Sequence, residues 1–204
     1  RLTRYADDWV VTCRTRAEAE RALGAARKIL EQLGVRINPV KTRIVHIRYG
    51  FEFLGYLIKC GTQPLRLKAA QIKSRRQQGA LYAYPTGHSI RRFKDRVRQL
   101  TKRTVPLSTE GIIEKLNPLL RGWGQYYCRA HVRRLFNRLN RWTVRRLRSH
   151  RYKRWRNTGW RELPEHRCFG ELGLVNLLAL IPSLAPRLRS TFVKAGCGKL
   201  ARPV

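Results

Sequence analysis

Residues 88–150 carry apolar side chains at three- and four-residue intervals, with many basic side chains between them. This spacing places the apolar side chains on one face of an α-helix and the basic ones on the others. Ser89, Ser108 and Thr109 precede the first two stretches, and Glu110 falls in the first turn of the second, as is typical of helix starts. Three amphipathic helices with short connections predict a small bundle. The apolar positions are Ile90, Phe93, Val97, Leu100, Ile112, Ile113, Leu116, Leu119, Leu120, Val132, Leu135, Phe136, Leu139, Trp142 and Leu147.

The chain is strongly basic, with 45 Lys and Arg against 12 Asp and Glu in 204 residues, a formal net charge of +33. This charge makes a polyanion the expected partner and argues against an ordinary metabolic enzyme for acidic substrates. Because 43% of the residues are hydrophobic, the chain is not a disordered basic tail. Residues 1–85 hold 17 basic and 6 acidic residues, net +11, and residues 86–204 hold 28 and 6, net +22. Contacts with a nucleic-acid backbone should therefore concentrate in the second half.

The cysteines give no sign of a metal or disulfide framework. Five of them stand at irregular spacings without a C-x-x-C pair, which favours a reducing compartment. Two short pairs, Cys128 with His131 and His166 with Cys168, lack the usual ligand spacing of a zinc site. No stretch is long and apolar enough to span a bilayer, so no membrane partner is expected.

The N-terminal residues 1–13 predict two short strands joined by a turn, because the second arm is rich in β-branched and aromatic side chains. The turn carries two adjacent carboxylates, Asp7 and Asp8. Asp is common in turns because its side chain bonds to nearby backbone groups. Taken alone, this pair is most simply interpreted as turn chemistry.

A helix is expected directly after this turn. Thr15 and Glu18 form a T-x-x-E capping box, and Gly34 occupies the position of a C-terminal cap. Two further strands are expected over residues 44–47 and 51–59. A hairpin, a helix and more strands predict an α+β unit with one helix on a sheet.

Five sequence blocks occur in a recognisable order. Residues 5–8 are Tyr-Ala-Asp-Asp, the Tyr-x-Asp-Asp pattern of reverse transcriptases. Residues 33–42 and 51–56 resemble the next two blocks of group II intron reverse transcriptases, the latter being Phe-Glu-Phe-Leu-Gly-Tyr. Residues 89–95 are similar to the start of the thumb, and residues 113–127 resemble the maturase signature called domain X. Together the blocks resemble the C-terminal part of a group II intron-encoded reverse transcriptase/maturase.

The resemblance implies an α+β fold in which a partial reverse-transcriptase palm is followed by an all-α thumb and maturase bundle. It places the palm over residues 1–65, a connector over residues 66–87, and the thumb with domain X over residues 88–157. A basic tail over residues 158–204 is similar in part to the family's DNA-binding region, and no endonuclease is expected there.

By resemblance, Asp7 and Asp8 hold Mg²⁺ for nucleotidyl transfer, and Lys41 acts near the leaving pyrophosphate. The alternative for Lys41 is a solvated charge. The family's palm also needs an aspartate and fingers that lie upstream of this turn, and the sequence does not contain them. We therefore expect a member of the RNA-directed DNA polymerase family that is not polymerase-active by itself.

In the family, the thumb and domain X bind intron RNA and promote its splicing. Arginine side chains suit bidentate contact with phosphates, and aromatic rings can stack on unpaired bases. Aromatic side chains in a small bundle are more often part of the core, so the arginines are the firmer candidates. The aromatic candidates follow a Gly-x-Gly sequence that is typical of a turn. The candidate RNA-binding residues are Arg91, Arg92, Lys94, Arg121, Trp123, Tyr126, Tyr127, Arg133, Arg134, Arg138, Arg141, Arg145 and Arg146.

The expected partners are a group II intron RNA, a DNA target or primer duplex, and an upstream reverse-transcriptase fragment that would complete the palm. The expected setting is the cytoplasm of a bacterial-type cell, as part of a mobile element. The alternative is a generic basic nucleic-acid-binding protein in which the Tyr-Ala-Asp-Asp turn is incidental. Preference for an intron RNA over an unrelated structured RNA distinguishes the two.

Overall fold

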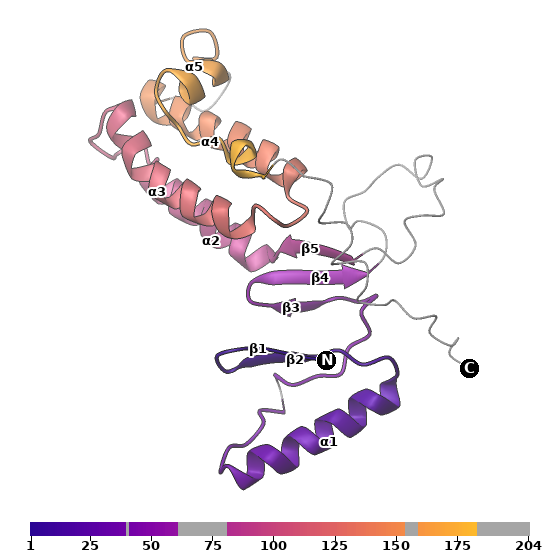
Figure 1. Cartoon of the computed structure of the whole chain (residues 1–204). Coiled ribbons are helices and arrows are strands. Elements are labelled where there is room, and N and C mark those ends of the chain that lie inside the picture. The colour runs from indigo at the N-terminus through magenta and orange to yellow at the C-terminus, as the bar shows by residue number, and fades with distance from the viewer. Residues whose placement is uncertain (40, 61–80, 154–158, 183–204) are drawn as a thin grey trace, which may run out of the picture. The chain divides into compact units, whose positions relative to one another are not determined.

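A computed structural model of the chain describes residues 1–39, 41–60, 81–153 and 159–182 (Figure 1). The chain forms two compact units, a first unit within Arg1–Tyr82 and a second unit over Ala83–Ala185. Short strands accompany one helix in the first part of the sequence, and the second part is mainly helical, so the predicted α+β class is confirmed.

The first unit opens with the expected hairpin. Strands β1 (Leu2–Tyr5) and β2 (Asp8–Val11) are antiparallel, with Leu2 opposite Val11 and Tyr5 opposite Asp8. Helix α1 (Arg16–Gln32) follows. Every residue of α1 is described and none is fully buried, so this helix keeps much of its surface exposed.

The ends of α1 are capped as the sequence predicts. The Thr15 hydroxyl accepts the N–H of Glu18 at 3.2 Å, which satisfies a backbone donor that the first turn leaves unpaired. At the other end, Gly34 adopts a left-handed φ of 70°, and the N–H of Val35 donates to the Leu30 carbonyl at 2.9 Å. This is a Schellman arrangement, which a residue without Cβ adopts at least cost.

The strands after α1 differ from the prediction. Residues 51–59 are not one strand but the hairpin of β3 (Phe51–Phe53) and β4 (Tyr56–Cys60). Leu54 and Gly55 both take positive φ values, 48° and 73°, which is the pattern of a two-residue type I′ loop. The expected strand over residues 44–47 is also wrong, because these residues form coil that leads into a turn.

Strand β5 (Leu81–Pro85) is the third member of a sheet ordered β3-β4-β5. Helix α2 starts after Thr86, whose hydroxyl accepts the N–H of Ser89 at 3.2 Å, so it begins earlier than the predicted start after Ser89. The helical elements of the second unit are α2 (Gly87–Leu100), α3 (Thr109–Tyr127), α4 (Arg133–Tyr152), the short α5 (Glu165–Gly170) and the 3₁₀ turn η3 (Leu177–Leu180). Helices α1 and α3 start where the sequence predicts them, after Thr15 and Ser108.

The core of the second unit is built from the predicted apolar faces. Burying one such side chain contributes roughly 1.5–3 kcal/mol, so a shared interior of this size stabilises the bundle strongly. Five of the predicted face residues lie at the edge of this core and are only partly buried: Ile90, Leu100, Leu119, Leu135 and Trp142. The fully buried residues include Phe93, Val97, Ile112, Leu116, Leu120, Val132, Phe136, Leu139, Val144 and Leu147.

The Gly-x-Gly sequence in α3 is not the turn that we expected. Gly122 and Gly124 both lie inside the helix. A Cβ added to Gly124 would lie 2.5 Å from Leu180 Cδ1 and 2.8 Å from Leu177 Cδ2. Gly124 therefore gives room for residues 171–182, which we call the strap, to pack closely on α3.

Two asparagine side chains hold the strap against the helices through hydrogen bonds. The Asn117 side chain of α3 donates to the Gly173 carbonyl and accepts the N–H of Val175, both at 2.9 Å. The buried Asn140 side chain of α4 accepts the N–H of Leu177 at 3.1 Å. Residues that follow the predicted maturase segment thus pack as part of the same unit.

Candidate metal turn and nucleic-acid interface

The two predicted catalytic carboxylates lie at the tip of the β1/β2 hairpin. Asp7 is in the two-residue loop and Asp8 is the first residue of β2, paired with Tyr5. Ala6 has a φ of 52°, a left-handed conformation that an L-residue adopts at some cost. Both carboxylates are exposed, so the hairpin presents them to a ligand.

Carboxylate oxygens are the ligands that Mg²⁺ prefers, so Asp7 and Asp8 have suitable donor chemistry. Two carboxylates on one tight turn do not surround an ion. No group of three or more His, Cys, Asp or Glu side chains that could hold a metal ion occurs in the part of the chain that the structure describes. The turn can contribute ligands to a metal site, and further residues must complete it.

Lys41 is exposed and follows the turn at Asn38, whose side-chain oxygen accepts the Lys41 backbone N–H at 3.3 Å. The segment after it lines a cavity of about 70 Å³ together with Trp9 of β2 and Ala22 of α1. Small-molecule sites commonly measure roughly 300–1,000 Å³, so this cavity is too small for a nucleotide. The leaving-group role of Lys41 stays a prediction.

The predicted arginines of the second unit lie on α2, α3 and α4, and almost all are exposed. Arg141 lies near a carboxylate, Glu165, at 3.9 Å, and its side chain remains 68% exposed. A distant, solvated pair of this kind contributes little to stability. These side chains therefore remain available to a polyanion. The exposed set is Arg91, Arg92, Arg121, Arg133, Arg134, Arg138, Arg141 and Arg145.

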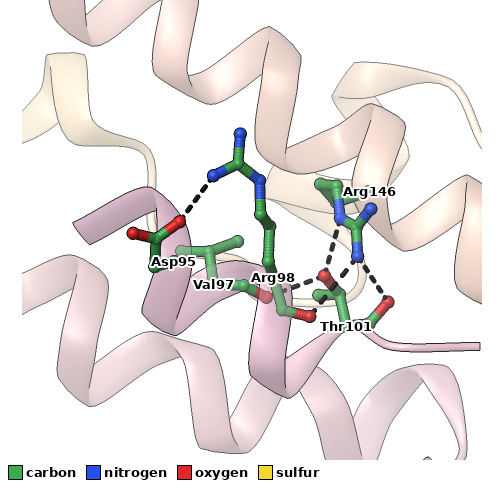
Figure 2. A network of polar contacts seen from close by, with 5 residues as sticks. All are labelled: Asp95, Val97, Arg98, Thr101 and Arg146. Carbon is green, nitrogen blue, oxygen red and sulfur yellow. Dashed lines mark hydrogen bonds and ion pairs between the residues drawn. The ribbon is translucent and has the colours of Figure 1, made fainter. Parts of the chain in front are cut away.

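Arg146 differs from this set, because its side chain joins α4 to the C-terminal end of α2 (Figure 2). Its Nε donates to Thr101 Oγ1 at 2.9 Å, and its Nη2 donates to the carbonyls of Thr101 at 3.1 Å and Arg98 at 3.4 Å. A cation is favourable at this end of a helix, where unpaired carbonyls concentrate negative charge. Burial, together with the nearby charges of Arg98 and Arg103, lowers the pKa of Arg146. These contacts give Arg146 a structural role.

The predicted lysine of this region, Lys94, approaches an aromatic ring. Lys94 Nζ and the Arg98 guanidinium carbon each lie 5.8 Å from the centroid of the Trp142 ring. Arg98 also forms an ion pair with Asp95 at 2.5 Å, and its side chain is 54% exposed. Trp142 thus holds two cations at the surface between α2 and α4.

The predicted aromatic residues divide into core and surface. Trp123 Nε1 and the Tyr127 hydroxyl both donate to Ser89 Oγ, at 3.1 and 2.9 Å, and the Trp123 ring packs 4.5 Å from that of Phe93. This network fixes both rings within the bundle. Tyr126 is 52% exposed and is the member of the three best placed to meet a base.

Sequence reasoning missed Arg98, Arg103 and Trp142 as residues of this surface. The signal for Arg98 was its position four residues after Lys94, which places both on one face of α2. Trp142 was assigned to the apolar stripe because spacing alone does not distinguish a buried ring from one at the edge of a helix face.

Two comparisons with known families agree with this architecture. Residues 1–58 match the family described as reverse transcriptase (RNA-dependent DNA polymerase), and residues 90–169 match the group II intron, maturase-specific domain. The chain belongs to the group II intron reverse transcriptase/maturase family. The reverse-transcriptase match contains the Asp7/Asp8 hairpin, α1 and most of the β3/β4 hairpin. The maturase match contains nearly all of α2, then α3, α4 and most of α5.

A search of curated proteins found no match. The two matched domains imply that the chain has nucleic-acid partners. Reverse transcriptases generally use divalent metal ions. None of the helices that the structure describes is both long and apolar enough to cross a membrane.

Proposed function

We propose that the second unit binds a group II intron RNA and promotes its splicing. The observation that supports this most directly is the set of exposed arginines on α2, α3 and α4, which lie inside the segment that matches the maturase-specific domain. Arginine binds phosphate through two parallel hydrogen bonds, and each phosphate contact releases counterions. A folded bundle covered with arginine can hold a structured RNA in its active shape.

We further propose that Asp7 and Asp8 contribute Mg²⁺ ligands to RNA-directed DNA synthesis in a mobile element. Asp7 and Asp8 would hold Mg²⁺, which would supply activation of the primer hydroxyl and stabilisation of the charge on the leaving group. The hairpin presents both carboxylates, and Lys41 would meet the leaving pyrophosphate. A DNA target or primer duplex is the second nucleic-acid partner. Two carboxylates on one turn do not surround an ion, so we infer that the hairpin acts only together with further residues that complete the site.

The maturase proposal is tested by comparing two RNAs of equal length, a group II intron and an unrelated structured RNA. Binding is measured by fluorescence anisotropy over a series of salt concentrations, because any basic protein binds RNA at low salt. We expect clearly tighter binding to the intron at about 150 mM salt. Equal affinity for both RNAs would support the generic basic protein instead.

The enzyme proposal is tested by adding a polypeptide that carries the upstream palm and fingers. We expect Mg²⁺-dependent cDNA synthesis by the mixture and its loss in Asp7→Ala. The wild-type chain tested by itself is the control. Polymerisation by this chain alone would show that it already holds a complete metal site.

A further inference from the structure

Basic side chains align where α2 faces α4 in the second unit. Lys94 and Arg98 are four residues apart on α2, and Trp142 and Arg146 are four residues apart on α4, so each pair lies on one helix face. The two faces meet, because Trp142 contacts both α2 cations and Arg146 bonds to the end of α2. We use the name basic seam for Lys94, Arg98, Arg103, Trp142, Arg146 and Lys153.

The loop after α2 extends the seam toward the end of α4. Arg103 Nε donates to Ser149 Oγ at 3.4 Å, and Lys153 Nζ donates to the Arg103 carbonyl at 2.5 Å. Along α4, the distance from Trp142 to Lys153 is about 16 Å at a rise of about 1.5 Å per residue. This length is sufficient for several consecutive phosphates of one nucleic-acid strand.

Most partners that hold these cations are neutral. Lys94 lies over an indole ring, Arg103 bonds to a hydroxyl, and Lys153 bonds to a backbone carbonyl. A neutral partner fixes the position of a cation without cancelling its charge. Arg98 is paired with Asp95 but remains half-exposed. Like charges are therefore held close together, and the charges of Arg98 and Arg103 add to burial in lowering the pKa of Arg146.

We propose that the basic seam is a preorganised binding site for the phosphodiester backbone of RNA. This inference rests on the proposed maturase function and specifies where the RNA strand binds. Trp142 holds Lys94 and Arg98 in place. The seam then presents positive charge to phosphates, and phosphate contacts carry no information about base sequence. Because the cations are already positioned, little side-chain entropy is lost when phosphates bind.

The test compares two triple variants with the same change in charge. The seam variant is Lys94→Gln/Arg98→Gln/Arg103→Gln, and the control variant is Arg21→Gln/Arg27→Gln/Lys28→Gln on exposed positions of α1. Both are measured in the full chain with the intron RNA by anisotropy, from about 50 to about 300 mM salt. Gln is a good helix former, and Arg146 is left intact because it supports the fold.

We expect the seam variant to bind the intron RNA at least about tenfold more weakly, and its slope of log affinity against log salt to be shallower by about 2 to 3. The control variant should change by less than about a third of that. Equal losses of affinity in the two variants would overturn the proposal that the seam binds RNA. If wild type does not prefer the intron RNA, the maturase proposal fails separately, because that measurement involves no variant.

Two further measurements keep the result interpretable. An Arg98→Lys/Arg103→Lys variant keeps the charge but not the guanidinium fork, so it should lose much less affinity than the seam variant, whereas an equal loss would show that side-chain geometry and packing, and not charge, matter. A DNA duplex of equal length is the other source of phosphates. A greater loss for the DNA duplex than for the RNA would assign the seam to DNA and overturn its assignment to RNA.

Discussion

At the scale of single residues, the two glycines of the maturase signature have different surroundings in one helix. A Cβ at Gly122 would meet no atom within 4 Å, whereas a Cβ at Gly124 would enter the contact with Leu177 and Leu180. Neither glycine has a positive φ, so neither is required by backbone conformation. Gly124 is explained by close packing, and nothing in the structure explains Gly122.

Substituting each glycine with alanine should give opposite results. Gly124→Ala should lower the free energy of unfolding by about 1–3 kcal/mol, because the new methyl group forces two packed leucines to move. Gly122→Ala should raise it by up to about 1 kcal/mol, since alanine is the better helix former. Urea titration monitored by circular dichroism measures both. If Gly124→Ala were as stable as Gly122→Ala, the strap would not pack on α3 as described.

We expect His131 to make the second unit sensitive to acid. The Ala83 backbone N–H donates to His131 Nδ1 at 3.3 Å, and the His131 backbone N–H donates to the Ala83 carbonyl at 2.9 Å. Burial lowers the pKa of His131 from its usual 6.5. The unfolded chain then binds the proton more readily, so this stability is present above pH 6.5 and is lost as the pH falls through the folded-state pKa.

We expect Tm to fall more for wild type than for His131→Gln when the pH is lowered from about 7.5 to about 5. The exposed His166 provides the matched control, and His166→Gln should follow wild type. Parallel curves for wild type and His131→Gln would show that another group causes the acid sensitivity.

At the scale of elements, the strap has little regular structure and depends on side chains of the helices beneath it. Asn140 is almost fully buried, and its amide donates to Asn176 Oδ1 at 2.7 Å as well as accepting the N–H of Leu177. Loss of this amide would leave a buried backbone N–H without its partner. The strap should therefore be the part of the second unit that responds first to changes in α4.

Asn140→Ala should lower the free energy of unfolding by about 1–3 kcal/mol, the usual cost of leaving a buried polar group unpaired. Amide hydrogen exchange at residues 175–178 should accelerate more than exchange in the middle of α3. Asn137→Ala, at an exposed position on the same helix, is the control and should neither lower the free energy of unfolding nor accelerate exchange. Unchanged hydrogen exchange in Asn140→Ala would show that the Asn140 side chain does not hold the strap in place.

At the scale of the whole molecule, the two units differ in how much they bury. The second unit has a continuous interior, whereas the large apolar residues Leu2, Ile29, Leu33 and Tyr49 of the first are exposed. The first unit presents carboxylates on a hairpin, and the second presents arginines on helices. The two proposed activities therefore depend on different side chains and should be separable by mutation.

Asp7→Asn/Asp8→Asn should leave the affinity for intron RNA within about twofold of wild type. Removing two carboxylates from a chain of net charge +33 makes it slightly more basic and deletes no phosphate ligand. Anisotropy with the intron RNA checks this, and the seam variant is the positive control for loss. A large loss of affinity would link the hairpin to RNA binding.

Local capping chemistry made the ends of α1 and the start of α3 predictable. Thr15 with Glu18, Gly34 and Ser108 all lie at the helix ends expected from sequence. The hairpin at Leu54 was missed because leucine rarely takes a positive φ, so only the glycine after it indicated a turn.

The candidate site was predicted less completely than the helices. The Asp7 turn and the exposed arginines were found because hairpin patterns and helical spacing are local. The strap and the seam were not found, because each depends on pairs such as Asn140 with Leu177 or Arg98 with Trp142, which are far apart in sequence.

The crowding of cations along the basic seam also determines how dissolved salt acts on the protein. Mobile anions screen repulsion between fixed positive charges, so the free chain should melt at a higher temperature in about 300 mM KCl than in about 50 mM. The same anions compete with RNA for those charges. Raising the salt concentration should therefore dissociate the complex while it stabilises the free protein. A high-salt buffer that stabilises the isolated protein is then unsuitable for keeping the ribonucleoprotein assembled.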